Sequence, residues 1–153
     1  MSSTTLSGSC LCGLVRYEIR GKIGPVTHCH CRTCRKAQGG AFVTSAPVRT
    51  KYFHLLSGAE LVAEFASSPG KTRCFCRRCG APLWSRREAL PDVIRLRLGL
   101  LDSDPERRPV AHIWVGEKAS WYEITDDLLQ SPGDGEELEA RANAAGASGV
   151  SST

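Results

Sequence analysis

Apolar and polar residues alternate along much of the first hundred positions of the chain. Within residues 14–20, Val15, Tyr17 and Ile19 alternate with polar side chains, which is the pattern of a strand that buries one face. Residues 93–98 repeat the alternation, with arginines between the apolar positions. This pattern predicts a mostly β protein.

Groups of glycine, proline and serine separate the other predicted strands. We expect strands at 41–46, 52–56, 60–65, 110–115 and 120–124, the last two forming a closing hairpin. Pro47 is expected to end the first of them. Residues 32–38 are expected to form one short helical turn, so little helix is predicted.

The composition changes at residue 131, where Ser, Gly, Ala and Glu become dominant. We interpret residues 1–130 as one domain and residues 131–153 as a polar, low-complexity tail with at most a short helix at 136–145. A chain of 153 residues with 41% hydrophobic residues has the size and apolar content of a single globular domain.

The N-terminus does not have the pattern of a targeting segment. The first residues lack a basic region followed by an apolar run, and no stretch approaches the roughly 18 apolar residues that span a membrane. We therefore expect a cytoplasmic protein with no membrane partner.

Basic residues are in excess outside the tail. The net charge is +4, but residues 131–153 hold four acids and one base, so residues 1–130 carry 19 bases, 12 acids and a net +7. Such a surplus attracts small anionic substrates or nucleic acid, although arginines that cover sheet edges are the more ordinary explanation. No basic helix or base-stacking motif is recognisable, so a nucleic-acid partner is not expected.

Eight cysteines are the most informative residues of the chain. They form three groups, one C-x-C and two C-x-C-x-x-C, at Cys10/Cys12, Cys29/Cys31/Cys34 and Cys74/Cys76/Cys79. Thiols one or two residues apart suit chelation better than disulfide bonding, and they favour zinc over an iron–sulfur cluster or free thiols.

The central group is the candidate catalytic site. Cys29 and Cys31 share one side of an extended segment, and a turn can return Cys34 to the same point. Three thiolates leave one position of a tetrahedral zinc unclaimed, and an open position distinguishes a catalytic zinc from a structural one. The eight sulfurs could instead form two closed four-cysteine sites, and spacing alone does not choose.

The cysteine groups and their flanking residues resemble the glutathione-dependent formaldehyde-activating enzyme family, which includes the domain found in centromere protein V. The resemblance runs from about Ser7 to Gln130. It is carried by Cys10-x-Cys12-Gly13, Cys29-His30-Cys31-x-x-Cys34-Arg35, Phe75-Cys76-x-x-Cys79-Gly80-x-x-Leu83, His112-Ile113-Trp114 and Trp121.

This resemblance implies an all-β fold of several coiled, folded-over sheets and two zinc ions. The structural zinc would be held by Cys10, Cys12, Cys76 and Cys79, and the catalytic zinc by Cys29, Cys31 and Cys34. Cys74 departs from the family pattern as we know it. It is a possible fourth ligand of the central zinc, which would close that site, but a plain buried cysteine is the more ordinary reading.

The chemistry that the resemblance implies suits a zinc ion with three thiolates. Such a site carries a net −1 charge, so it activates water weakly and is better suited to bind a further thiolate. The expected activity is that of a carbon–sulfur lyase. Glutathione would add to formaldehyde to form S-hydroxymethylglutathione, or the adduct would be cleaved, with Arg32 and Arg35 as candidates to hold the tripeptide carboxylates.

Two other functions fit the same residues. One is a non-catalytic, zinc-stabilised module that binds a protein or nucleic acid, and the other is a redox or metal-buffering protein. His30, between two ligands, is expected at the surface or beside the metal ligands but facing away from the metal. His112 is expected to be a hydrogen-bonded histidine of the core or of a cleft.

Overall fold

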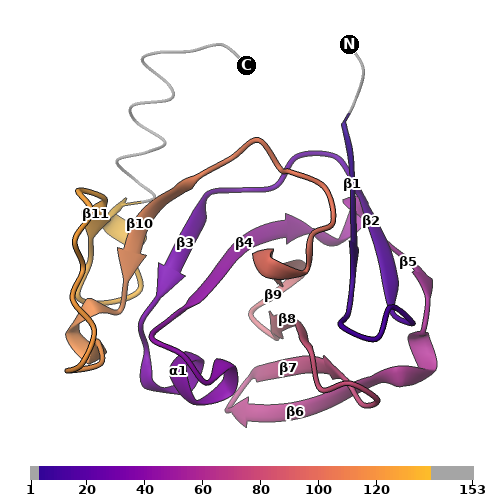
Figure 1. Ribbon diagram of the computed structural model, residues 1–153, viewed down its shortest axis with the longest axis horizontal. Coiled ribbons are helices and arrows are strands. Elements are labelled where there is room, and N and C mark those ends of the chain that lie inside the picture. The colour runs from indigo at the N-terminus through magenta and orange to yellow at the C-terminus, as the bar shows by residue number, and fades with distance from the viewer. Residues whose placement is uncertain (1–3, 139–153) are drawn as a thin grey trace. The chain divides into compact units, whose positions relative to one another are not determined.

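The computed structural model describes residues 4–138, and in them the prediction of a mostly β protein with little helix is confirmed (Figure 1). The chain divides into two compact units. The first comprises Met1–Val26 and Thr44–Arg108, and the second Thr27–Val43 and Pro109–Thr153. None of the helices in residues 4–138 has the length and apolar character that a membrane span requires.

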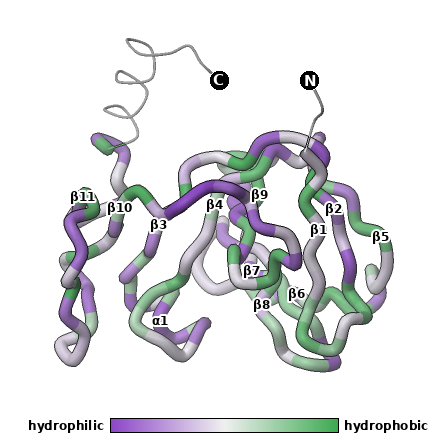
Figure 2. The backbone as a smooth tube through the Cα atoms, turned by 45° about the horizontal axis from the view of Figure 1, so that its top comes forward, coloured by the Kyte–Doolittle hydropathy of each residue, from purple (hydrophilic) through white to green (hydrophobic). Residues whose placement is uncertain are grey.

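The first unit begins with a three-stranded antiparallel sheet. Its order is β1-β2-β5, formed by β1 (Thr5–Ser9), β2 (Arg16–Arg20) and β5 (Phe53–Ser57). Tyr17 and Ile19 of β2 are buried, as their alternation predicted. The colours of Figure 2 show how hydrophobic and hydrophilic residues interleave along the strands.

Five further antiparallel strands continue the first unit. In spatial order they are β4 (Val43–Arg49), β9 (Leu90–Arg97), β8 (Pro82–Arg87), β7 (Lys71–Cys76) and β6 (Val62–Ser68). One face packs into the core through a cross-strand row of Ala46, Leu96, Trp84 and Cys74. Short 3-10 turns link several strands, namely η1 (Thr50–Tyr52), η2 (Ala59–Leu61) and η3 (Leu98–Leu100).

One strand prediction in the first unit needs correction, and one strand of the same sheet was missed. β4 continues past Pro47 to Arg49, because Pro47 still lies in register opposite Arg95 of β9. The strand β8 was not predicted, since its sequence ends in the exposed pair Arg86 and Arg87 and does not alternate.

The described residues of the second unit include three strands and the helix α1. The strands β3 (Val26–Cys29), β10 (Pro109–Ile113) and β11 (Leu129–Gln130) follow the order β11-β10-β3 in the sheet, and β10 and β11 run parallel. The helix α1 (Arg32–Gln38) is where the sequence predicted it. It ends at Gly39, whose φ of 73° is the left-handed conformation that favours glycine.

The predicted closing hairpin is wrong in its second arm. After β10 the chain forms the 3-10 turn η4 (Val115–Glu117), and residues 120–124 form a turn and an irregular segment in place of a strand. The side chain of Lys118 holds this turn by donating to the backbone oxygens of Ala119 and Tyr122. Trp121, whose apolar character suggested a strand, is 70% exposed.

The first eight residues of the predicted tail lie against β10. The backbone N–H of Ser131 donates to His112 O at 2.9 Å, and Trp114 N–H donates to Gly133 O at 2.7 Å. Ser131 is buried, and its hydroxyl bonds to the carboxylate of Glu137. The rest of the predicted tail, residues 139–153, lies outside the described residues, and the boundary at residue 130 stays a prediction.

A glycine on β1 makes room for the most buried aromatic ring of the first unit. Gly8 lies opposite Tyr17, and a Cβ at Gly8 would fall 2.3 Å from ring atoms of Tyr17. We expect Gly8→Ala to lower the free energy of unfolding by about 1–3 kcal/mol through overpacking. Chemical denaturation of Gly8→Ala and of Gly99→Ala, where nothing lies within 4 Å of the added Cβ, checks this. Equal stability of the two variants would contradict it.

Candidate metal centres and their surroundings

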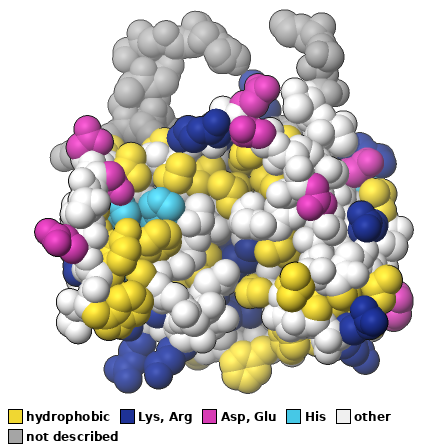
Figure 3. Space-filling view, in the orientation of Figure 1, with side chains coloured by type: hydrophobic (Ala, Val, Ile, Leu, Met, Phe, Trp, Pro, Cys, Tyr) yellow, Lys and Arg dark blue, Asp and Glu magenta, His cyan; other side chains and the backbone are white. Residues whose placement is uncertain are grey.

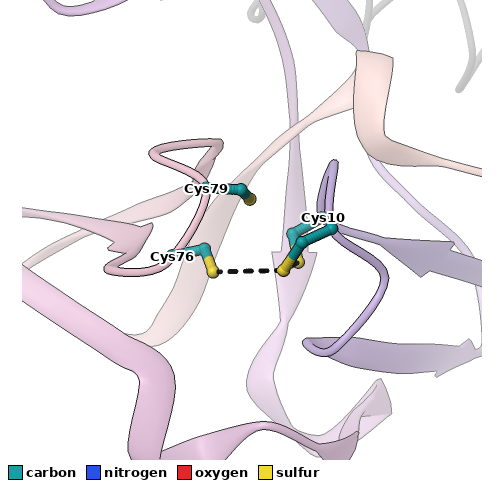
Figure 4. Close-up of side chains that lie close together, drawn as sticks. Cys10, Cys76 and Cys79 are labelled. Carbon is teal, nitrogen blue, oxygen red and sulfur yellow. Dashed lines mark hydrogen bonds between the residues drawn. The ribbon is translucent and has the colours of Figure 1, made fainter.

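Four cysteines that are distant in the sequence meet in the first unit. Cys10, Cys12, Cys76 and Cys79 place their sulfurs within 4.8 Å of one another. Figure 4 shows Cys76 and Cys79 on one side of this cluster and Cys10 on the other. The structure therefore brings together the set that the family resemblance had assigned to a structural zinc.

Two similar backbone turns aim these sulfurs at one point. After Cys10, Gly13 returns its N–H to Cys10 O at 3.0 Å, and after Cys76, Gly80 returns its N–H to Cys76 O at 2.7 Å. Both glycines have positive φ, 79° and 78°, which other residues rarely adopt. The tight turns thus explain why glycine follows both Cys12 and Cys79.

The chemistry of the four sulfurs fits a bound cation. The Cys10 and Cys12 sulfurs are 3.5 Å apart, those of Cys12 and Cys76 are 3.9 Å apart, and all four thiols are free. Burial raises the pKa of Cys76, whereas for Cys79 the effect of burial is outweighed by hydrogen bonds, first from the backbone of Ala81, that lower the pKa to about 6. Thiolates this close repel unless a cation lies among them, and four sulfurs match a closed tetrahedral zinc site.

The second unit contains the three-cysteine cluster. Cys29 ends β3, Cys31 is the N-cap of α1, and Cys34 lies in the first turn of α1, so that the three sulfurs fall within 4.8 Å of one another. The Cys31 sulfur accepts a hydrogen bond from Cys34 N at 3.3 Å. Cys29 and Cys34 are buried, and Cys31 is half-buried.

This cluster also requires a cation if its thiols are to ionise. Hydrogen bonds with the Cys31 and Cys34 thiols, together with burial, raise the pKa of Cys29 far above its usual value. Among the described residues, no fourth Cys, His, Asp or Glu joins the group. Three converging thiols with no fourth protein ligand match the donor set of a zinc site with an open position.

Cys74, the residue that departed from the family pattern, belongs to neither cluster. It is 2% exposed and lies on the core face of β7, where its sulfur is 3.5 Å from the Arg86 guanidinium. Burial raises the pKa of its thiol. Its surroundings are those of a buried core cysteine.

Histidines and aromatic rings lie beside the three-cysteine cluster. Figure 3 shows histidine side chains gathered next to hydrophobic ones in this part of the chain. The ring of Phe42 packs against His28 with centroids 4.3 Å apart, against His30 at 5.1 Å and against Tyr122 at 5.5 Å. His30 is completely buried, so it does not lie at the surface.

A chain of hydrogen bonds connects His30 to an acid. His30 Nε2 lies 2.7 Å from His112 Nδ1, and His112 Nε2 lies 3.0 Å from a carboxylate oxygen of Asp126. The bond with His112 lowers the pKa of Asp126, and a carboxylate only accepts, so neutral His112 carries its proton on Nε2. His112 Nδ1 then accepts from the Nε2–H of His30, and this sequence of bonds selects the tautomer of both rings.

The hydrogen bonds of His30 hold in place the peptide between Cys29 and Cys31. The backbone N–H of His30 donates to Ile113 O at 2.9 Å, so both its main chain and its ring are anchored on β10. Burial, and then the electrostatic interactions with His112 and His28, lower the pKa of His30 to about 4, so the ring of His30 is neutral at pH 7. Sequence reasoning missed Asp126, because nothing in its local sequence distinguishes it from the neighbouring Asp127.

Asp126→Ala should release the two rings while leaving the fold intact. Without the carboxylate, nothing requires the proton on His112 Nε2, so we expect mixed tautomers of His112 and His30. Long-range proton–nitrogen NMR spectra of the imidazoles measure this. Asp127→Ala, an exposed neighbour, should leave one tautomer, and a single unchanged tautomer in Asp126→Ala would show that the carboxylate does not set it.

The two arginines proposed as carboxylate ligands have structural contacts. Arg35 donates from Nη2 to Glu117 O at 3.0 Å, and the backbone N–H of Arg32 donates to the Glu117 carboxylate at 2.9 Å. Glu117 thereby joins α1 to η4. Arg35 therefore links α1 to η4 through its side chain, whereas Arg32 does so through its backbone alone. The assignment of these two arginines to substrate carboxylates stays a prediction.

Comparisons with known proteins point to one enzyme family. The model of the glutathione-dependent formaldehyde-activating enzyme family matches residues 5–117. A Halomonas elongata protein, provisionally named as such an enzyme, is 34% identical over 130 residues, which cover 78% of this chain and 80% of that protein. A Schizosaccharomyces pombe protein named as an uncharacterized lyase is 30% identical over 77 residues, 50% of this chain and 54% of the other.

A solved structure is similar in fold. The crystal structure of a Rhodobacter sphaeroides protein matches with a TM-score of 0.55 at 22% identity, over 64% of this chain and 89% of that one. At this identity the likeness concerns the fold alone.

Proposed function

The chain belongs to the glutathione-dependent formaldehyde-activating enzyme family, and on that premise we propose that it is a carbon–sulfur lyase whose substrate thiol binds at Cys29, Cys31 and Cys34. The reaction is the formation or cleavage of an adduct between glutathione and formaldehyde. The observation that carries the proposal is the convergence of these three thiols with no fourth ligand group among the described residues.

The proposal includes two bound zinc ions. Cys10, Cys12, Cys76 and Cys79 would hold a structural zinc, and Cys29, Cys31 and Cys34 a catalytic one. When bound at the three-cysteine cluster, zinc would supply a position where a substrate thiol loses its proton and is held as a thiolate.

The residues around the cluster position the cysteines for this role. Cys31 caps α1 through its own sulfur, which fixes the direction of the thiol. His30 anchors the intervening peptide on β10. Preorganised ligands of this kind lose little entropy when the site is filled.

The reaction balances without a redox partner. In the forward direction the thiolate sulfur adds to the aldehyde carbon, the carbon–sulfur bond forms, and the carbonyl electron pair moves to oxygen, which takes up a proton. In reverse, the hydroxyl loses its proton, the carbonyl re-forms and the carbon–sulfur bond breaks.

Exchange spectroscopy by NMR tests the proposal. Glutathione and formaldehyde form the adduct slowly without a catalyst, and the purified two-zinc protein should increase the exchange rate between free and hydroxymethylated glutathione. An exchange rate that the protein leaves unchanged, with both metals present, would instead favour a non-catalytic zinc-stabilised binding module.

A further inference from the structure

The backbone of Trp114 adopts a conformation that large side chains rarely take. Its φ of 57° lies in the left-handed region, where the Cβ of any residue except glycine crowds the backbone. Among residues 4–138 the other such residue is Glu106, which lies in an exposed bend and donates its N–H to the Asp104 carboxylate. A bulky indole in this conformation costs free energy, so the surrounding structure must hold it there.

Hydrogen bonds on both sides of Trp114 hold this conformation. Its N–H donates to Gly133 O at 2.7 Å, and its carbonyl accepts from the N–H of Glu117 at 3.0 Å. The next residue, Val115, donates its N–H to Ser131 O at 3.0 Å. The strained backbone is therefore fixed from two directions within the second unit.

The side chain of Trp114 packs against the hydrophobic cluster that contains the three candidate metal ligands. The buried part of this cluster consists of two cysteines and two aliphatic residues, namely Cys29, Cys34, Val43 and Ile113. Its half-buried members are Cys31 and Trp114. An apolar shell around metal ligands controls which molecules reach them. Because the other members are buried, a substrate reaches the sulfurs from the side on which Cys31 and Trp114 lie.

The left-handed backbone brings two consecutive side chains to this cluster. Successive side chains of a strand point to opposite faces, so an extended residue after Ile113 would direct its side chain away from that of Ile113. Ile113 instead belongs to the same cluster against which Trp114 packs. The unusual φ at the end of β10 thus turns the indole toward the side of the cysteines.

Glu117 ties Trp114 to the least buried of the three cysteines. Its N–H donates to Trp114 O, and its carboxylate accepts from the backbone N–H of Arg32, the residue after Cys31. One residue therefore joins the backbone of Trp114 to the start of α1. This link supports a shared role for the indole and the Cys31 thiol at the open side of the cluster.

We propose that Trp114 is a positioning residue for the substrate thiol, and that its indole packs against the carbon attached to the substrate sulfur while the sulfur lies among Cys29, Cys31 and Cys34. The inference rests on the proposed function for the place where the thiol binds. An indole offers a large, rigid apolar surface. It would orient the carbon–sulfur bond and displace water from the two atoms.

Tryptophan fluorescence tests this placement without relying on catalysis. The chain has three tryptophans, and Trp121 is 70% exposed. Glutathione should shift the emission of the two-zinc protein to shorter wavelength, because its carbon displaces water from the Trp114 ring. The shift should persist in Trp121→Phe and disappear in Trp114→Phe. A shift that persists in Trp114→Phe, or no shift when calorimetry shows that glutathione binds, would overturn the proposal.

Trp114→Gly tests how much the indole contributes to binding. Glycine suits the left-handed backbone, so the fold is expected to tolerate this truncation. The Kd of glutathione, measured by calorimetry, should rise about tenfold, and Trp114→Phe should recover most of the affinity. Trp121→Gly, the same truncation at an exposed position, should leave the Kd unchanged. If the indole only stabilised the fold, Trp114→Gly would lower Tm and leave the Kd unchanged, which would overturn the proposal.

The outcomes separate this inference from the proposed lyase activity. If glutathione binds against Trp114 but adduct exchange is not catalysed, the positioning role stands and the lyase proposal fails. If exchange is catalysed while Trp114→Gly binds glutathione as tightly as the unsubstituted protein does, the lyase stands and the positioning role fails. Two-zinc protein that does not bind glutathione would overturn both.

Discussion

Replacing Cys76 by serine is expected to remove one zinc ion and to destabilise the first unit severely. Cys76 is fully buried at the end of β7 and belongs to a cluster that joins the β1–β2 turn to the β7–β8 turn. Structural zinc sites supply folding free energy directly, so we expect a loss of at least about 4 kcal/mol and a fall in Tm of roughly 10 °C. Metal analysis together with thermal unfolding measures both effects.

Cys74 provides the matched control for this variant. It lies two residues earlier on the same face of β7 and is also buried, but it belongs to neither cluster. Cys74→Ala should keep both zinc ions and lose only about 1 kcal/mol through a small cavity. A similar loss of zinc and stability in the two variants would show that burial, and not metal binding, explains the effect of Cys76→Ser.

Cys31→Ser is expected to abolish activity with little effect on the fold. Serine still caps the helix α1, but an alcohol is a poor zinc ligand, so the cluster loses one of its three sulfurs. Cys31 is also the least buried of the three cysteines. We expect kcat/KM for the adduct reaction to fall at least about 100-fold, with Tm changed by only a few degrees.

The variant Cys74→Ser tests whether Cys74 is a ligand of the central zinc. If Cys74 were a fourth metal ligand that closed the central site, Cys74→Ser would open that site and raise the activity. We expect Cys74→Ser to retain most of the activity. Full activity in Cys31→Ser would contradict the assignment of the three-cysteine cluster as the reacting site.

Short stretches of sequence were enough to predict several strands, the helix α1 and the three-cysteine cluster. The strands around Tyr17 and Ile94 follow from alternation, and the helix after Cys31 follows from its short polar segment. Cys29, Cys31 and Cys34 lie within six residues, so their spacing alone indicated convergence. The grouping of Cys10 and Cys12 with Cys76 and Cys79 required the family resemblance, because spacing allowed other pairings.

The features that the sequence did not predict depend on contacts between residues that are not neighbours along the chain. Asp126 reaches His112 from a loop after η4, and no periodicity links the two positions. The turn at residues 120–124 depends on the side chain of Lys118, a contact that overrides the apolar pattern.

Proton release on glutathione binding shows whether a substrate thiol binds as a thiolate at Cys29, Cys31 and Cys34. Calorimetry of the two-zinc protein in buffers of different ionisation enthalpy counts the protons. Because a free thiol is almost wholly protonated at pH 7, we predict release of about one proton per glutathione and none with S-methylglutathione or in Cys31→Ser. Binding of glutathione without proton release, or equal release in Cys31→Ser, would contradict the account.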